Sequence, residues 1–129
     1  MADDQHHQAT LLIVEDDEPL GELLAVLLGG IAGWEAIAVP DVGTAQHVVG
    51  QQPIDLVLLD LNLPGRSGLE LLSHLQADPN WHDRPVIVVS ADAEQPAVQS
   101  AMQAGQATCC IAKPFDLGDV VHAVAAALP

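Results

Sequence analysis

Residues 55 to 60 read Asp55-Leu56-Val57-Leu58-Leu59-Asp60, and this run is the strongest structural signal in the chain. Four consecutive apolar residues are typical of a strand buried on both faces, as in parallel α/β sheets, because a half-exposed strand alternates apolar and polar residues. The run ends in a carboxylate. We therefore expect the strand to deliver Asp60 to one edge of a sheet.

The same layout recurs along the chain. Leu11-Leu12-Ile13-Val14 runs into Glu15-Asp16-Asp17, Val86-Ile87-Val88-Val89 ends at Ser90, and a fourth short strand ends at Lys113-Pro114, which holds the only lysine. In open parallel sheets, ligands bind outside the carboxyl ends of the strands. The pattern therefore predicts one polar cleft that gathers acids, a hydroxyl and an ammonium group.

Between the apolar runs lie amphipathic segments with helical spacing. The pattern predicts strands at residues 11–15, 35–39, 54–59, 86–89 and 108–112, and helices at 19–28, 43–49, 68–76, 94–103 and 117–128. Asp116 is a plausible N-cap for the last helix. Strands that alternate with helices through short loops indicate βαβ units, hence a doubly wound α/β fold with a five-stranded parallel sheet and five helices.

Composition excludes several classes of function. The 129 residues include 18 acids but only three Lys or Arg residues, which gives a formal net charge of −15. Direct binding to nucleic acid needs several cations to neutralise phosphates, and anionic membranes are disfavoured for the same reason. A cationic partner or a metal ion fits better. No apolar run approaches the ~20 residues of a membrane helix.

The N-terminal residues 1–9 are expected to form a flexible, acidic tail with two adjacent histidines, and residues 10–129 one domain. The first ten residues have no basic segment and no apolar core, so we expect no secretory signal and a cytoplasmic location. Cys109 and Cys110 are adjacent in an apolar segment. A cytoplasmic protein keeps such thiols reduced, so core packing is the favoured interpretation and a redox role the alternative.

The predicted cleft has a definite chemistry. Carboxylates held close together repel one another unless a cation lies among them, and Mg²⁺ is typically bound by one or two carboxylates with water and phosphate. A lysine beside such a site makes sense as a partner for a bound phosphoryl group. The residues therefore indicate magnesium-assisted phosphoryl transfer with a carboxylate as the nucleophile.

Four motifs in this order resemble the receiver (CheY-like) domain of two-component response regulators. They are Ile13-Val14-Glu15-Asp16-Asp17, Asp60 with Asn62-Leu63-Pro64-Gly65 and Gly68, Ser90-Ala91, and Lys113-Pro114-Phe115, and the match covers about residues 10–128. The resemblance implies a flavodoxin-like sheet of strand order 2-1-3-4-5. It also implies a cis peptide bond between Lys113 and Pro114.

The resemblance assigns a role to each matching position. Asp60 would accept a phosphoryl group from a histidine kinase or a histidine phosphotransfer protein, and Ser90 and Lys113 would contact the phosphoryl oxygens. Glu15, Asp16, Asp60 and the main-chain carbonyl of Asn62 would hold Mg²⁺, for which Mn²⁺ or Ca²⁺ could substitute. The protein would be a signalling module that modifies only itself, not a turnover enzyme. Asp17, Asp41 and Asp55 are interpreted as structural.

Two features depart from the family pattern. Receivers usually place an aromatic residue three positions before the lysine, as part of the switch with Ser90, and here that position is Cys110. A small thiol cannot fill the volume of a ring, so we expect the conformational switch to be muted or to be built differently from the usual one. Residues 93–128 also contain one basic residue, Lys113, which argues against a dimer joined by salt bridges through this region.

Three alternatives remain open. A degenerate receiver could serve as a binding scaffold that works without phosphorylation. A phosphatase that uses Asp60 as its nucleophile would need a general acid two residues later. This chain has Asn62 at that position, which argues against a phosphatase. The three acids in the first loop argue against a flavodoxin-like cofactor domain, because they would repel a phosphate.

The signal would pass to a downstream protein or to a C-terminal output domain absent from this sequence. We favour the interpretation that the sequence is a fragment rather than a complete regulator.

Overall fold

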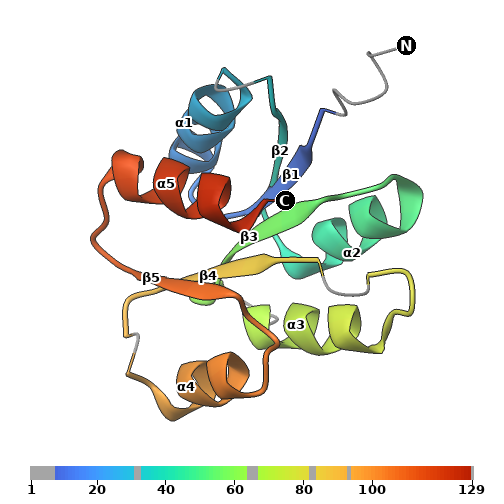
Figure 1. Ribbon diagram of the computed structural model, residues 1–129, viewed down its shortest axis with the longest axis vertical. Helices are drawn as coiled ribbons and strands as arrows, with labels where there is room; N and C mark the ends of the chain where they lie inside the picture. Colours follow the sequence, from blue (N-terminus) through green and yellow to red (C-terminus); the bar gives the residue numbers. More distant parts are fainter. Residues whose placement is uncertain (1–7, 31–32, 64–66, 82–83, 93, 129) are drawn as a thin grey trace.

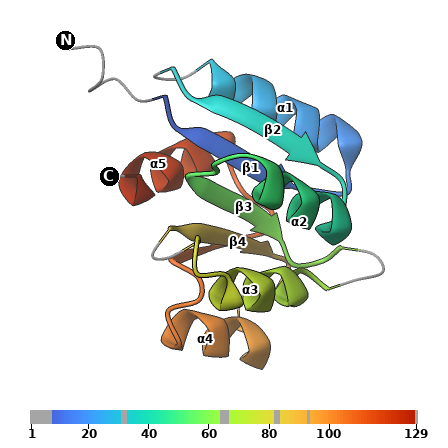
Figure 2. The same ribbon diagram turned by 90° about the vertical axis from the view of Figure 1, so that its right-hand side faces the viewer.

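The computed structural model describes residues 8–30, 33–63, 67–81, 84–92 and 94–128. Its core is a single sheet of five parallel strands in the order β2-β1-β3-β4-β5. Helices α1 and α5 cover one face, and helices α2, α3 and α4 cover the other (Figures 1 and 2). The predicted doubly wound fold and its strand order are confirmed.

The elements follow one another in strict alternation along the chain. In order they are β1 (Thr10–Val14), α1 (Glu18–Gly29), β2 (Glu35–Val39), α2 (Val42–Gln51), β3 (Leu56–Asp60), α3 (Gly68–Ala77), β4 (Val86–Ser90), α4 (Pro96–Gln103), β5 (Cys109–Ala112) and α5 (Leu117–Ala127). Every predicted element is present, with ends that differ by at most two residues.

One of these shifts bears on the site. The third strand was predicted at residues 54–59, but β3 begins at Leu56 and includes Asp60. Asp60 pairs with Val89 in the ladder, and the next amide, Leu61 N–H, donates to the Val89 carbonyl at 2.9 Å. The backbone of Asp60 is therefore fixed by the sheet rather than by a loop.

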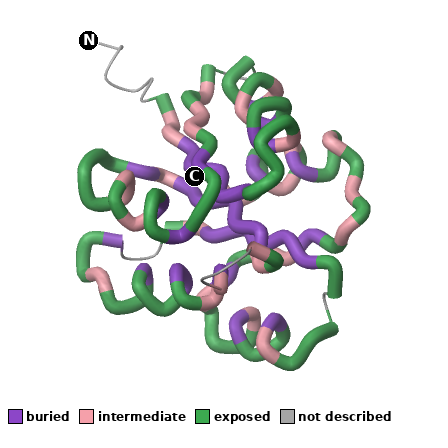
Figure 3. Tube along the Cα trace, turned by 180° about the vertical axis from the view of Figure 1, so that it is seen from behind, coloured by how far each residue is buried: buried purple, intermediate pink, exposed green. Residues whose placement is uncertain are grey.

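The strands alternate their apolar side chains between two cores. On β3, Val57 and Leu59 pack on the side of α2, α3 and α4, while Leu56 and Leu58 pack on the side of α1 and α5. Buried residues are concentrated in the central strands, and the outer helix faces are exposed (Figure 3). Both sheet faces are dry, which explains why these strands are continuous apolar runs.

Three acids outside the site make structural hydrogen bonds, two of them at helix starts. Asp17 caps α1 by accepting from Leu20 N–H, and Asp41 caps α2 by accepting from Thr44 N–H. Asp55 accepts from Thr10 N–H at 2.7 Å, which ties β1 to the segment before β3. Their structural interpretation is therefore supported. Asp116 is the N-cap residue of α5, as predicted, but its side chain makes no capping hydrogen bond.

The cysteines of β5 are free thiols that point to opposite sides of the sheet. Cys110 packs against the α2–α3–α4 core and Cys109 against the α1–α5 core, each half-buried. Burial, with a smaller contribution from Cys109, raises the pKa of the Cys110 thiol above its ordinary value. Among the described residues, no helix is long and apolar enough to cross a membrane.

Candidate functional site

Four strands end at the same edge of the sheet, and the predicted polar residues meet there. Asp60 and Ser90 are the last residues of β3 and β4, Glu15 and Asp16 follow β1, and Lys113 follows β5. Carboxylate oxygens of Glu15, Asp16 and Asp60 all lie within 4.8 Å of one another. The structure therefore brings the sequence-predicted acids into one cluster.

Asp60 is the centre of this cluster. The residue is only 3% exposed, and its Oδ2 accepts a hydrogen bond from Lys113 Nζ at 2.8 Å. Its Oδ1 accepts from the main-chain N–H of Asn62, also at 2.8 Å. Both oxygens are thus held in place by donors from different loops, and the peptide bond between Lys113 and Pro114 is cis, as predicted.

The crowding of the acids shifts the pKa of the Glu15 carboxyl group. Burial, together with the negative charge of Asp60, raises the pKa of Glu15 to about 7, although a hydrogen bond from Asp17 N–H opposes the shift. Only 7% of Glu15 is exposed. A carboxyl group with such a pKa holds a proton at pH values where an exposed glutamate is ionised.

Lys113 is the cation that partly balances these acids. Its burial lowers the pKa of the ammonium group, but the hydrogen bond and charge of Asp60, with the charges of Glu15 and Asp16, outweigh burial and raise it. Lys113 therefore stays charged at neutral pH. Its backbone is fixed as well, because Lys113 N–H donates to the Ser90 carbonyl at 2.9 Å.

Ser90 is fully buried and faces its own loop in this structure. Its Oγ donates to the Asp92 carbonyl and accepts from the Asp92 N–H, both at 3.1 Å. The hydroxyl therefore already has two partners, and it would have to turn to reach a group bound on Asp60. Asp92 completes the turn with its side chain, which accepts from Glu94 N–H.

Two motif residues, Asn62 and Gly68, shape the site through contacts that the sequence did not predict. The Asn62 side chain accepts a hydrogen bond from Ala91 N–H at 3.0 Å. A Cβ at Gly68 would lie 2.9 Å from the Asp60 carbonyl oxygen, so only glycine lets α3 start this close to β3. The polar residue two positions after Asp60 was the available signal for the first. The predicted motif residues Pro64 and Gly65 lie outside the described residues, as do His6 and His7.

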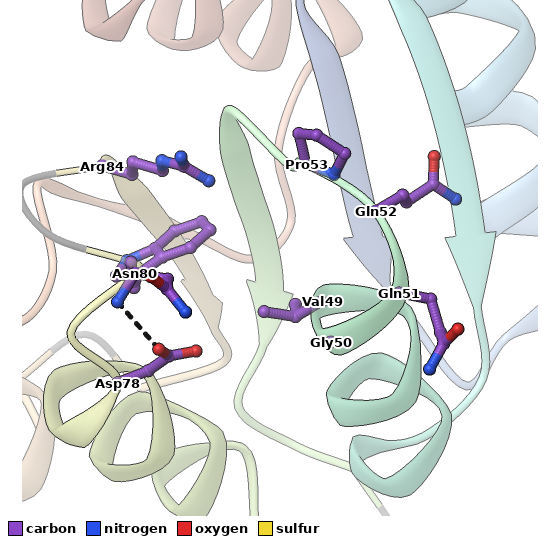
Figure 4. A pocket seen from close by; sticks show the side chains of 9 residues that line it. Val49, Gly50, Gln51, Gln52, Pro53, Asp78, Asn80 and Arg84 are labelled. Carbon is purple, nitrogen blue, oxygen red and sulfur yellow. Dashed lines mark hydrogen bonds between the residues drawn. The ribbon is translucent and has the colours of Figure 1, made fainter.

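A hollow of about 310 Å³ lies at the opposite edge of the sheet, and none of the predicted site residues lines it. It opens between the end of α2 and the loop before β4, with Gln51, Pro53, Asn80 and Arg84 around it (Figure 4). Arg84 Nη1 donates to the Ile54 carbonyl at 2.8 Å, and the guanidinium lies 5.7 Å from the Trp81 ring centre. These contacts tie β3 to β4, so we interpret this edge as structural.

Comparison with known proteins identifies the family. Residues 11–125 match the model of the response regulator receiver domain. The chain is 36% identical over 119 residues to the phosphate regulon transcriptional regulatory protein PhoB of Pseudomonas aeruginosa, covering 92% of this chain and 51% of that protein. It is 39% identical over 107 residues to the transcriptional regulatory protein MalR of Bacillus subtilis, covering 82% and 44% respectively.

Comparison with solved structures leads to the same family. The non-phosphorylated receiver domain of HemR from Leptospira biflexa superimposes with a TM-score of 0.83 at 28% identity, covering 93% of this chain and 94% of that one. The chemotaxis protein CheY4 of Vibrio cholerae gives 0.84 at 21% identity, covering 94% and 99%, which supports the fold. The chain belongs to the receiver domains of two-component response regulators. It spans about half the length of the curated relatives named above.

Proposed function

We propose that Asp60 is the phosphoacceptor of this receiver domain and that the donor is a phosphohistidine on a histidine kinase or a histidine phosphotransfer protein. The observation that carries the proposal is a nearly buried carboxylate held at 2.8 Å by Lys113, beside two further carboxylates. In the transfer, a carboxylate oxygen of Asp60 forms a bond to phosphorus while the P–N bond breaks. The electron pair of that bond stays on the imidazole nitrogen.

We further propose that Glu15, Asp16, Asp60 and the main-chain carbonyl of Asn62 hold Mg²⁺, with Mn²⁺ or Ca²⁺ as substitutes. The donor set fits, because hard divalent cations take oxygen ligands and the three carboxylates already lie within 4.8 Å of one another. A bound Mg²⁺ would neutralise charge on the phosphoryl oxygens. Lys113 would contact the same oxygens, and Ser90 would join it after turning away from Asp92.

The proposed activity is self-modification rather than turnover. Asn62, two residues after Asp60, has no proton to donate or accept usefully at neutral pH, so it cannot act as a general acid or base. The phosphoryl group would then be lost slowly to water. We propose that the phosphorylated form changes a contact with a downstream protein or an output domain in the cytoplasm, without direct binding of nucleic acid by this domain.

A second candidate is a scaffold that binds its partner without phosphorylation. The observation that favours it is Cys110, a half-buried thiol packed against the α2–α3–α4 core at the position where receivers usually carry the switch aromatic. The complete set of Asp60, Lys113 and Ser90 favours the phosphoacceptor.

The decisive experiment is the intact mass of the protein after incubation with acetyl phosphate and Mg²⁺, with Asp60→Asn alongside. We expect a gain of one phosphoryl group that is absent from the variant and is lost on standing. A folded protein that binds Mg²⁺ but gains no mass would instead support the scaffold.

A further inference from the structure

The two loops that border Asp60 are joined by one side-chain hydrogen bond. Asn62, in the loop after β3, accepts through Oδ1 from the main-chain N–H of Ala91, in the loop after β4. The Asn62 side chain is exposed, so packing in the core does not require it. The bond therefore depends on the carboxamide itself.

The bond leads directly to the phosphoacceptor. Asn62 N–H donates to Asp60 Oδ1, while its carboxamide oxygen accepts from Ala91, so one residue connects the Asp60 carboxylate to the Ala91 N–H. Register agrees, because Asp60 lies beside Val89 and Ala91 follows two residues later. The Ala91 N–H thus belongs to the immediate surroundings of Asp60.

Two donors at the carboxyl end of β4 are held by neutral acceptors in this structure. Ala91 N–H is held by the Asn62 carboxamide, and the Ser90 hydroxyl by the Asp92 carbonyl. A phosphoryl group adds about −1.5 to −2 charges and three strong acceptor oxygens. Hydrogen bonds to an ionised acceptor are roughly twice as strong as neutral ones. A phosphoryl group on Asp60 would therefore compete well for both donors.

We propose that the Asn62 carboxamide is a placeholder acceptor, which occupies the Ala91 N–H until a phosphoryl group on Asp60 displaces it; the inference rests on the proposed function. Phosphorylation then transfers the Ala91 N–H from Asn62 to a phosphoryl oxygen and separates the two loops. Asn62 acts as a positioning residue. The device moves a loop beside α4 without a switch aromatic, which this chain lacks at Cys110.

The test uses beryllium fluoride, which binds a carboxylate and imitates a phosphoryl group, with Mg²⁺ and the intact chain. In Asn62→Ala the competing acceptor is gone, so we expect beryllium fluoride to bind about two- to tenfold more tightly, the range for one neutral hydrogen bond. Without beryllium fluoride, the Ala91 amide should exchange with solvent faster in this variant. A purely structural role for Asn62 would weaken binding instead.

Two further variants make the result specific. Asn62→Asp keeps an oxygen acceptor at the same place, so the Ala91 amide should stay protected while beryllium fluoride binds less well. Asn80→Ala removes an exposed asparagine at the other edge of the sheet and should change neither quantity. Unchanged Ala91 exchange in Asn62→Ala, or binding that is equal or weaker than in the natural protein, would overturn the placeholder alone. If the natural protein binds no beryllium fluoride, the proposed function and the placeholder both fail.

Discussion

Polar groups are balanced differently at the two ends of the parallel strands. At the amino ends of the strands, Arg84 is satisfied by the Ile54 carbonyl and by the Trp81 ring. At the carboxyl ends, three carboxylates lie beside one cation of the described residues, Lys113, and the pKa of Glu15 rises to about 7. The polar groups at the amino ends are satisfied by their neighbours. At the carboxyl ends, repulsion among the carboxylates remains, and a bound cation would relieve it.

This difference separates stability from chemistry within one domain. Groups with strongly shifted pKa values cluster at functional sites. Changes near Trp81 should therefore alter the unfolding free energy without altering Mg²⁺ binding, whereas changes near Asp60 should alter Mg²⁺ binding or phosphorylation, whatever they do to stability.

The largest effect on stability is expected from Trp81→Ala. Trp81 is 3% exposed, and removing a buried ring of this size typically costs about 3–5 kcal/mol of unfolding free energy. Urea denaturation measures the loss. The stabilisation by Mg²⁺ should persist in the variant, or in Trp81→Phe if the alanine variant does not fold. A Mg²⁺ effect that disappears in a folded Trp81 variant would show that the two edges are coupled.

Mg²⁺ should give the next largest effect, because it relieves repulsion that exists only in the folded state. At ~100 times its dissociation constant, the ion would add about 2.7 kcal/mol to the unfolding free energy. Thermal melts with and without Mg²⁺ test this, with Asp16→Asn as the control that should respond less. If Mg²⁺, Mn²⁺ and Ca²⁺ all leave the melting temperature unchanged, the metal site is excluded.

Lys113→Ala should lower stability by about 2 kcal/mol without Mg²⁺, because it leaves Asp60 facing two carboxylates without its cation. Mg²⁺ should restore most of this loss, whereas labelling by acetyl phosphate should fall. Arg84→Ala is the matched loss of a cation at the other edge. It should cost about 1 kcal/mol from its hydrogen bond and leave labelling unchanged. Normal labelling of Lys113→Ala would contradict the role of the lysine.

A smaller effect is expected from pH. The pKa of Glu15 is 4.5 in the unfolded chain and about 7 in the folded protein, so the folded state binds more protons between these values. Without Mg²⁺, stability should therefore fall as pH rises from about 4.5 to 7 and level off above. We expect about 1–2 kcal/mol, less than the full shift because water reaches the rim of the site. Glu15→Gln should lack this component, and identical pH profiles for both proteins would contradict it.

Much of the fold was predictable because its signals are local. Four-residue apolar runs such as Leu56 to Leu59 can be buried on both faces only in a covered parallel sheet. The acids at their ends then identify the edge that carries the site. Strand ends were less predictable: Asp60 joins β3 because Val89 of β4 pairs with it, and that partner lies 29 residues away. Asp116 has the residue type of a cap, but its side chain makes no capping bond.

The sequence alone determined the class of fold, the edge that carries the polar residues and the identity of Asp60, Glu15, Asp16 and Lys113 as a group. These follow from hydrophobic period and from residue type at the strand ends. Only the tertiary structure decided which donor holds which oxygen: Lys113 on Asp60, Ala91 on Asn62, and Ser90 on its own loop. Hydrogen bonds between loops depend on register and on distances of a few tenths of an ångström, and no local pattern in a sequence encodes these.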